Sequence, residues 1–370
     1  MNRSRLGELS EQGVSIWIDS LSRGMLETGE LERLLNEDAV VGVTSNPTIF
    51  QKAMADGSRY DEQLREVLKH EDDPTEIFLR LAMEDIRRAC DLMRPVWDGG
   101  KGMDGYVSLE VDPTLAYDRE ATFEQAMRLH AEVDRPNLHV KIPATLPGLG
   151  AIEDCVAKGK SINVTLIFSL DRYAAVAEAY VKGLERLVAS GGDPTRVASV
   201  ASFFVSRVDS EADKRLEEIG GQATRLQGKL AIANAKLAYR HWQEKFAGPR
   251  WEFLAAKGAT AQRCLWASTS TKNPEYRDVM YVEQLIGPET VNTMPLETAV
   301  AFQDHGKAEA GTITDGVPEA RQLLERLAEV GVDYDDVVAT LEAEGVQKFA
   351  DSFDELLDGI RAKRSELAAA

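Results

Sequence analysis

Eight short runs rich in β-branched and aromatic residues are spread along the whole chain, and longer stretches with helical patterns separate them. The runs lie at residues 15–19, 40–46, 105–111, 138–143, 161–168, 197–205, 263–269 and 290–295. Most of them are continuously apolar rather than alternating, which is typical of parallel strands covered on both faces. Strands that alternate with helices build α/β folds. Eight such units predict a closed (β/α)8 barrel.

The clearest helical pattern covers residues 170–189, where apolar residues recur at spacings of three or four and Gly191 and Gly192 follow. Further helices are predicted over 120–133 and 228–246. An open doubly wound sheet is the alternative fold. It usually carries a glycine-rich first βα turn, and no GxGxxG follows the first predicted strand, while GxxxxGK[ST] does not occur in the sequence. The TIM-barrel fold is therefore favoured.

The 370 residues exceed the roughly 250 of a typical (β/α)8 barrel. The surplus predicts extra helices at about 51–97 and about 210–260, and a helical C-terminal extension at about 318–370. No low-complexity linker interrupts the sequence. We therefore expect a single decorated barrel domain over residues 1–370.

The charge and the cysteine content exclude several classes of function. A net charge of −19 argues against sequence-independent binding of nucleic acid and against binding to an anionic membrane surface. No run of about 18 apolar residues is present to span a membrane, and the first residues do not read as a signal peptide. Three widely spaced cysteines without a CxxC pair predict a reducing cytoplasm. No histidine spacing typical of a metal site occurs, so no metal is expected.

Polar residues stand at the predicted ends of the strands. In a (β/α)8 barrel, the carboxyl ends of the strands carry the active site. Such residues can be assigned to the first seven strands but not to the last: Asp19, Asn46, Glu110, Lys141, Asn163 with Thr165, Ser202 with Arg207, and Ser268 with Lys272. If the barrel assignment holds, these side chains share one rim.

Lys141 interrupts the apolar run 138–143 and has two interpretations. Lysines commonly lay their stem along apolar surface and keep the ammonium group in water. Alternatively, a lysine desolvated in a barrel mouth has a lowered pKa and can attack a ketone as a neutral amine. The imine chemistry needs proton donors and acceptors, which Asp19, Glu110 and Thr165 would supply. This set of partners favours the second interpretation.

Several of these residues also have ordinary structural explanations. Asp19 alone is more often a helix cap than a base, and Asn46 precedes a proline in a common turn dipeptide. Arg207 could form a surface ion pair or hold a phosphate. The stretch STSTKN at 268–273 could begin a helix or donate hydrogen bonds to a phosphate. Glu110 is harder to explain structurally, because a buried charge needs a partner.

Taken together, these motifs resemble the transaldolase family, in its longer bacterial type, over nearly the whole chain. The resemblance is carried by SIWIDSLSR (15–23), GVTSNPTIF (42–50), VSLEVDPTLAYD (107–118), HVKIPAT (139–145), INVTLIFS (162–169) and SFFVSRVD (202–209). It implies a (β/α)8 barrel and no metal or organic cofactor. It also implies transfer of a dihydroxyacetone unit from sedoheptulose 7-phosphate to glyceraldehyde 3-phosphate in the non-oxidative pentose phosphate pathway. Ketose and aldose phosphates are then the partners of the chain.

The resemblance further implies roles for the four proposed catalytic residues. Lys141 matches the Schiff-base lysine of the family. Asp19 matches the base that takes the C4 hydroxyl proton when the C3–C4 bond breaks. Glu110 matches the acid/base that works through a bound water, and Thr165 helps to hold that water.

Six more residues are implied to bind the substrate. Asn46 and Asn163 match contacts to the dihydroxyacetone hydroxyls, and Ser202 matches another substrate contact. Arg207 matches the main phosphate-binding arginine. Family members commonly show Ser-x-Arg after the seventh strand, whereas this chain has a longer spacing and a lysine, so the second phosphate site is assigned to Ser268 and Lys272.

Two alternatives remain open at the level of sequence. Fructose-6-phosphate aldolase-like enzymes release free dihydroxyacetone, but they are much shorter and generally carry Gln in place of Glu110 and Tyr in place of Phe204. A non-catalytic sugar-phosphate-binding barrel would be expected to lack the lysine or the acids. Both alternatives are weaker than transfer. The sequence does not decide between a monomer and a homodimer.

Overall fold

The computed structural model of the chain describes residues 4–55 and 58–369. Its strands form a closed parallel barrel in the order β1 to β8, with β8 paired back to β1. The strands are β1 (Val14–Ile18), β2 (Val40–Val43), β3 (Tyr106–Glu110), β4 (Leu138–Pro143), β5 (Ile162–Ile167), β6 (Ser199–Phe204), β7 (Arg263–Ala267) and β8 (Thr290–Met294). The predicted (β/α)8 barrel is confirmed, and every predicted strand overlaps its observed counterpart.

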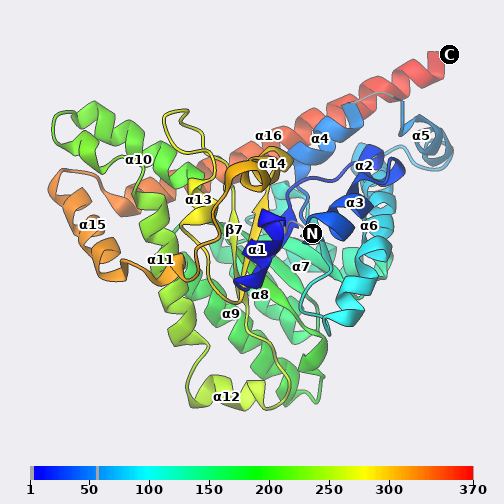
Figure 1. The fold of residues 1–370 in the computed structure, drawn as a ribbon. Coiled ribbons are helices and arrows are strands. Elements are labelled where there is room, and N and C mark those ends of the chain that lie inside the picture. The colour runs from blue at the N-terminus through cyan, green and yellow to red at the C-terminus, as the bar shows by residue number, and fades with distance from the viewer. Residues whose placement is uncertain (1–3, 56–57, 370) are drawn as a thin grey trace.

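The helices surround the barrel and extend beyond it (Figure 1). They are α1 (Arg5–Glu11), α2 (Arg23–Glu27), α3 (Glu30–Glu37), α4 (Pro47–Ala55), α5 (Asp61–Val67), α6 (Pro74–Gly99), α7 (Arg119–Val133), α8 (Leu146–Ala157), α9 (Leu170–Ala189), α10 (Ser206–Ile219), α11 (Leu230–Lys245), α12 (Pro249–Ala255), α13 (Met280–Glu283), α14 (Leu296–His305), α15 (Val317–Glu329) and α16 (Tyr334–Ala369). Short 3-10 turns are η1 (Pro113–Leu115), η2 (Pro194–Arg196), η3 (Ala223–Leu226) and η4 (Thr312–Thr314).

The helix predicted over 170–189 coincides with α9. Its N-cap is Ser169, whose hydroxyl accepts a hydrogen bond from the Arg172 amide.

The surplus residues form helices in the three predicted places. Helices α4, α5 and α6 separate β2 from β3, and α10, α11 and α12 separate β6 from β7. Helices α15 and α16 follow the last strand. The assignment of the whole chain to one domain stays a prediction. Within residues 4–55 and 58–369, no helix combines the length and the apolar character needed to cross a membrane.

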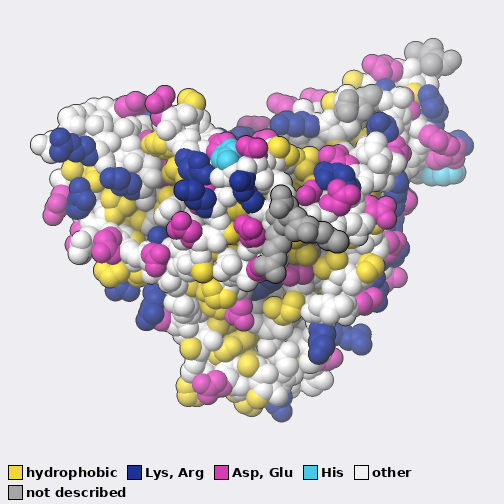
Figure 2. Space-filling view, in the orientation of Figure 1, with side chains coloured by type: hydrophobic (Ala, Val, Ile, Leu, Met, Phe, Trp, Pro, Cys, Tyr) yellow, Lys and Arg dark blue, Asp and Glu magenta, His cyan; other side chains and the backbone are white. Residues whose placement is uncertain are grey.

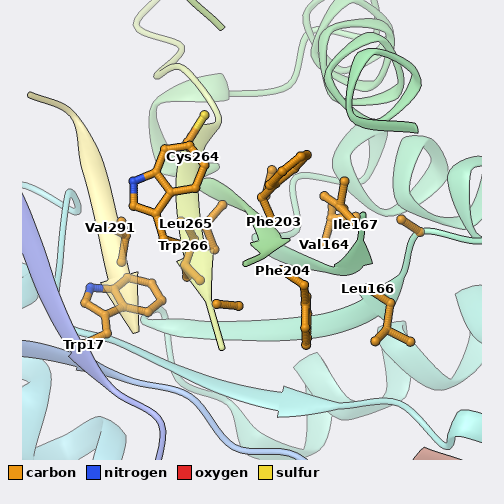
Figure 3. Close-up of a cluster of buried hydrophobic side chains, with 14 of the residues drawn as sticks. Trp17, Val164, Leu166, Ile167, Phe203, Phe204, Cys264, Leu265, Trp266 and Val291 are labelled. Carbon is orange, nitrogen blue, oxygen red and sulfur yellow. The ribbon is translucent and has the colours of Figure 1, made fainter. Parts of the chain in front are cut away.

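Large aromatic side chains fill the barrel and the layer around it. Trp17 of β1 and Gly42 of β2 show how tightly the interior is packed, because a Cβ at Gly42 would lie 2.5 Å from the indole ring. The rings of Tyr106 and His139 stack at 3.9 Å beside that tryptophan. Figure 3 shows a neighbouring cluster in which Phe203 and other apolar side chains of adjacent strands gather. This packing holds the strands in fixed register beneath the rim.

Helix α16 crosses the carboxyl ends of the strands (Figure 1). Gly345 allows this close approach, because a Cβ there would already lie 3.1 Å from Leu166 at the end of β5. Thr48 of α4 and Ser352 of α16 share a hydrogen bond of 2.8 Å, so the two helices pack together beside the rim. The C-terminal helix therefore covers the end of the barrel where the polar residues were predicted.

Candidate functional site

Lys141 lies on β4 and points into the barrel mouth, with only 6% of its side chain exposed. Its Nζ is 3.2 Å from a carboxylate oxygen of Glu110 and donates a hydrogen bond of 3.0 Å to the backbone carbonyl of Ser45. The register explains the first contact, because Glu110 of β3 is aligned with Lys141 across the ladder. The ring of Phe349 on α16 lies 5.9 Å from the same nitrogen. The amine is thus nearly dry and faces one acid.

Asp19 follows β1 directly, at the same rim. Its carboxylate accepts a hydrogen bond of 2.7 Å from the hydroxyl of Thr44, which also contacts the hydroxyl of Thr293. Burial raises the pKa of Asp19 above its ordinary value, and the positive charge of Lys141 opposes the shift only in part. Asp19 does not cap a helix, since Ser22 is the N-cap of α2. A carboxylate with a raised pKa in a mouth of this kind is suited to accept protons.

Glu110 and Thr165 carry polar atoms whose hydrogen bonds are not satisfied. Burial raises the pKa of Glu110, and the charge of Lys141 offsets part of this. In the described part of the chain, neither the Glu110 carboxylate oxygens nor the Thr165 hydroxyl has a hydrogen-bond partner, although the ion pair to Lys141 is present. Glu110 also lines a small cavity of about 10 Å³ beside Asn46. Buried polar atoms are normally paired, with protein or with water, so this space suits a single water molecule.

Asn163 and Ser202 form a buried hydrogen-bonded chain. Ser202 donates to the Asn163 carbonyl oxygen at 2.7 Å, and the Asn163 amide donates to Ser108 at 3.1 Å. Asn163 is aligned with Lys141 across the ladder between β4 and β5. Asn46 caps α4, where its side-chain oxygen accepts from the amide of Ile49 at 3.0 Å. Asn46 therefore has a structural role as a helix cap, in place of the turn that its sequence suggested, and it lines the cavity at the mouth as well.

The predicted phosphate ligands follow β6 and β7 and line the same cavity as Lys141. Arg207 stands in the first turn of α10, and its guanidinium lies 5.3 Å from the ring of Phe204. Burial lowers the pKa of Arg207. Lys272 donates to the hydroxyl of Ser270 at 2.7 Å, and Ser268 contacts the α10 N-terminus through a hydroxyl pair with Ser206 at 2.9 Å. Among the described residues, neither Lys272 nor Ser268 contacts a carboxylate, which leaves the Lys272 cation available to an anion.

Eight of the ten predicted site residues line one cavity of about 130 Å³: Asp19, Asn46, Lys141, Thr165, Ser202, Arg207, Ser268 and Lys272. Glu110 and Asn163 do not line this cavity, but each touches its wall, the first through Lys141 and the second through Ser202. The strand-end prediction thus brings together residues from seven strands.

Several lining residues were missed by the sequence analysis. The expectation that the last strand contributes no polar group is wrong, because Thr293 of β8 lines the cavity and contacts Thr44. Threonines are frequent in strands for packing reasons, so the sequence did not mark Thr293 or Thr44 as site residues. Phe349 reaches the cavity from α16, far along the sequence, where it reads as an ordinary apolar helix residue. Ser270 lies within the hydroxyl-rich stretch that the sequence analysis did single out.

Within the described residues, no group of three or more His, Cys, Asp or Glu side chains is arranged to hold a metal ion. The buried amine of Lys141 faces the acid of Glu110, and Asp19, Arg207 and Lys272 line the same cavity as the amine. Such a set can form an imine with a carbonyl compound and move protons around it.

Comparisons with known proteins agree on one family. Residues 16–360 match the family described as Transaldolase/Fructose-6-phosphate aldolase. A protein of Acidothermus cellulolyticus named "Transaldolase" is 55% identical over 351 residues, which cover 95% of this chain and 94% of that protein. A protein of the same name from Frankia alni is 54% identical over 356 residues, 96% of both chains. A third, from Mycolicibacterium smegmatis, is 48% identical over 359 residues, 97% of both.

Proposed function

The chain belongs to the transaldolase/fructose-6-phosphate aldolase family, and from this premise we propose that it transfers a dihydroxyacetone unit between sugar phosphates through an imine on Lys141. The donor is sedoheptulose 7-phosphate and the acceptor is glyceraldehyde 3-phosphate, with erythrose 4-phosphate and fructose 6-phosphate as products. The observation that carries this proposal is the buried pairing of Lys141 with Glu110 at 3.2 Å. The amine of a Schiff-base enzyme has to lose a proton before it attacks a ketone.

Imine formation uses Lys141, Glu110 and Thr165. The raised pKa of Glu110 makes its carboxylate a stronger base than an exposed glutamate, so it can take the proton from the lysine ammonium group. The neutral amine then adds to C2 of the ketose and gives a carbinolamine. The protonated acid returns its proton to the departing hydroxyl group through a water held between Glu110 and Thr165, whose unpartnered oxygens and adjoining small cavity support this role. Water leaves, and a protonated imine remains.

Cleavage uses Asp19 as the base. Asp19 takes the proton of the C4 hydroxyl group, the C3–C4 bond breaks, and its electron pair moves into the protonated imine to give a neutral enamine. The aldose phosphate departs as an aldehyde. When the acceptor aldehyde binds, the enamine carbon attacks it, the protonated Asp19 returns its proton to the new hydroxyl group, and hydrolysis frees Lys141. The raised pKa of Asp19 supports both directions of this proton transfer.

Transfer requires that the enamine outlives the exchange of aldehydes. Protonation by water would release free dihydroxyacetone, so the mouth must limit the supply of protons. Phe204 and Phe349 line the cavity beside Lys141 and reduce the access of water. Asn46, Asn163 and Ser202 would hold the three-carbon unit in place. The apolar walls therefore favour transfer over an aldolase reaction.

The phosphate groups would bind at the wall of the cavity that Arg207 and Lys272 line. Arg207 is the principal ligand, because a guanidinium can hold a phosphate with two parallel hydrogen bonds. Lys272 adds a point charge, and Ser268 lies next to the N-terminus of α10, where the helix dipole favours an anion. We further propose a cytoplasmic location, which three buried, free cysteines support. The choice between a monomer and a homodimer stays open.

The test is chemical trapping of the imine. Borohydride added together with fructose 6-phosphate should reduce the imine and add the mass of the ketose adduct at Lys141, as peptide mass mapping would reveal. Lys141→Met should take up no label, and Asp19→Asn should still take it up, because imine formation precedes the Asp19 step. A label on another lysine, or no label on the active parent enzyme, would contradict the proposed mechanism.

A further inference from the structure

Four cations converge on the mouth of the barrel from four separate elements. Arg207 lies on α10, Lys272 follows β7, Lys348 lies on α16 and Lys52 lies on α4. Within residues 4–55 and 58–369, none of the four forms an ion pair with a carboxylate, and Lys52 and Lys348 have no hydrogen-bond partner either. Glu344 is close enough to influence Arg207 but forms no ion pair with it. Asp19 and Glu297 also act on these cations through space, so what the four cations lack is a direct carboxylate partner.

This arrangement contrasts with the rest of the molecule. The chain has a net charge of −19, and acidic and basic side chains are interspersed on the face that Figure 2 displays. Elsewhere the arginines find partners readily; Arg250, for example, pairs with both Glu178 and Glu185. Neighbouring unpaired cations repel one another, and a bound anion would reduce that repulsion. Arg207, together with partial burial and the neighbouring lysines, in fact lowers the pKa of Lys348.

The four cations form an inner and an outer pair. Arg207 and Lys272 line the cavity of about 130 Å³ that also contains Lys141. Lys348 and Lys52 do not line it, and both are exposed. Lys348 is nonetheless held at the edge of the cavity, because its neighbour in sequence, Phe349, is part of the cavity wall.

Lys52 is held at the same edge through the packing of α4 on α16. It lies one turn after Thr48, and Lys348 lies one turn before Ser352, the residue to which Thr48 is hydrogen-bonded. The charge of Lys52 reaches both Lys348 and Lys272, since it contributes to lowering their pKa values. The outer pair thus stands where a phosphate extending beyond the inner pair would arrive.

We propose that Lys348 and Lys52 form an outer phosphate-binding pair that draws sugar phosphates into the mouth and serves the longer ketose phosphate in particular. The inference rests on the proposed function. Both ketoses anchor C2 on the same lysine, so the phosphate of a seven-carbon donor lies one carbon farther out than that of a six-carbon donor. Arg207 is fixed by its helix, whereas a lysine ammonium on a flexible stem can follow a phosphate to either distance. The outer pair therefore lets one site accept two chain lengths.

The experiment compares Lys52→Gln, Lys348→Gln and the double variant with the parent enzyme. Steady-state kinetics would be measured with sedoheptulose 7-phosphate and with fructose 6-phosphate, over a range of salt concentrations. The double variant should raise KM for the seven-carbon donor about tenfold, which corresponds to one lost charged hydrogen bond, and should raise KM for the six-carbon donor less. The kcat of the double variant should equal that of the parent. The fall of kcat/KM with added salt should be shallower than in the parent, because steering by these charges is lost.

The controls separate phosphate binding from a structural role. Lys363→Gln removes the same charge from the same helix, but Lys363 is paired with Asp61, so this variant should match the parent in KM and in salt dependence. Lys348→Arg should restore most of the affinity. At saturating donor, the KM for unphosphorylated glyceraldehyde as acceptor should be the same in the parent and the double variant.

Three results would overturn the inference, the last of them together with the proposed function. An active parent whose double variant keeps its KM values and salt dependence would contradict the outer pair alone. Equal losses for phosphorylated and unphosphorylated acceptors would show that the lysines only support α16. A parent enzyme inactive with both ketose phosphates would instead contradict the proposed function, and the outer pair with it.

Discussion

Replacing Asp19 with asparagine tests the step that breaks the carbon–carbon bond. The substitution keeps the size and shape of the side chain, and the asparagine oxygen can still accept the hydrogen bond that Thr44 donates at 2.7 Å. What disappears is the negative charge and the ability to take a proton. Lys141 and Glu110, to which we assign imine formation, are untouched. The variant therefore separates bond cleavage from imine formation.

The size of the effect follows from the burial of Asp19. A positioned general base typically contributes about 10²- to 10⁴-fold to a rate, and most when its pKa lies near the working pH. Burial raises the pKa of Asp19 toward that range. We therefore expect the upper part of the interval, a loss of about 10³- to 10⁴-fold in kcat. This loss corresponds to about 4–5.5 kcal/mol of transition-state stabilisation.

The assay pairs turnover with trapping. Transfer to glyceraldehyde 3-phosphate gives kcat, and borohydride trapping at timed intervals gives the rate of imine formation. Asp19→Asn should have a lower kcat and an unchanged rate of trapping. Asp193 is an exposed aspartate that caps η2, and Asp193→Asn should leave both quantities unchanged. Equal loss of turnover and trapping would assign Asp19 to imine formation instead. Unchanged turnover would refute its role as a base.

The pH profile gives an independent check with a defined sign. Asp19 must be ionised to accept the C4 hydroxyl proton, and its folded-state pKa lies above the ordinary aspartate value because of burial. Activity should therefore fall as the pH drops through that raised pKa, at a higher pH than an exposed aspartate would give. In Asp19→Asn, the acidic limb due to this group should be missing from kcat. An unchanged acidic limb in the variant would mean that another group produces it.

Three further substitutions probe other parts of the molecule. Glu110→Gln should slow imine formation on Lys141 about 10²- to 10⁴-fold in timed trapping, and an unaltered trapping rate would remove Glu110 from that step. Arg207→Ala should raise KM for phosphorylated ketoses about 10- to 100-fold in steady-state kinetics, and equal losses with unphosphorylated substrates would argue against phosphate binding. Asp85→Ala removes the carboxylate that lies 2.9 Å from the buried Arg23 in the parent. Urea titration should therefore show about 3–5 kcal/mol less unfolding free energy. A loss below about 1 kcal/mol would mean that water compensates the charge of the arginine.

Much of the site was predictable because it depends on local order along the strands. A closed parallel barrel aligns the carboxyl ends of its strands, so residues far apart in sequence share a rim once each strand is recognised. Lys141 stood out because a lysine inside a continuous apolar run is uncommon. Glu110 stood out for the same reason. The register between β3 and β4 aligns Glu110 with Lys141, so the two unusual residues form an ion pair.

Other parts of the site depend on tertiary packing that no local pattern encodes. The carbonyl of Ser45 is a backbone group, which every residue carries, so its contact with Lys141 leaves no trace in the sequence. Phe349 and Lys348 belong to an amphipathic helix that would read the same if it packed elsewhere. Their approach to the mouth depends on contacts such as Thr48 with Ser352, 304 residues apart. Only the assembled fold places them.

The position of α16 also sets an order of events during synthesis. Residues 334–369 leave the ribosome after all eight strands, so the barrel and its reactive lysine can exist before their cover. In such a nascent chain, the ring of Phe349 cannot yet stand near the amine of Lys141. Once α16 docks, Phe349 stands against the amine and the outer lysines take their places at the rim. On the proposed function, the transfer of carbon to a second sugar therefore waits until the last helix of the chain has docked.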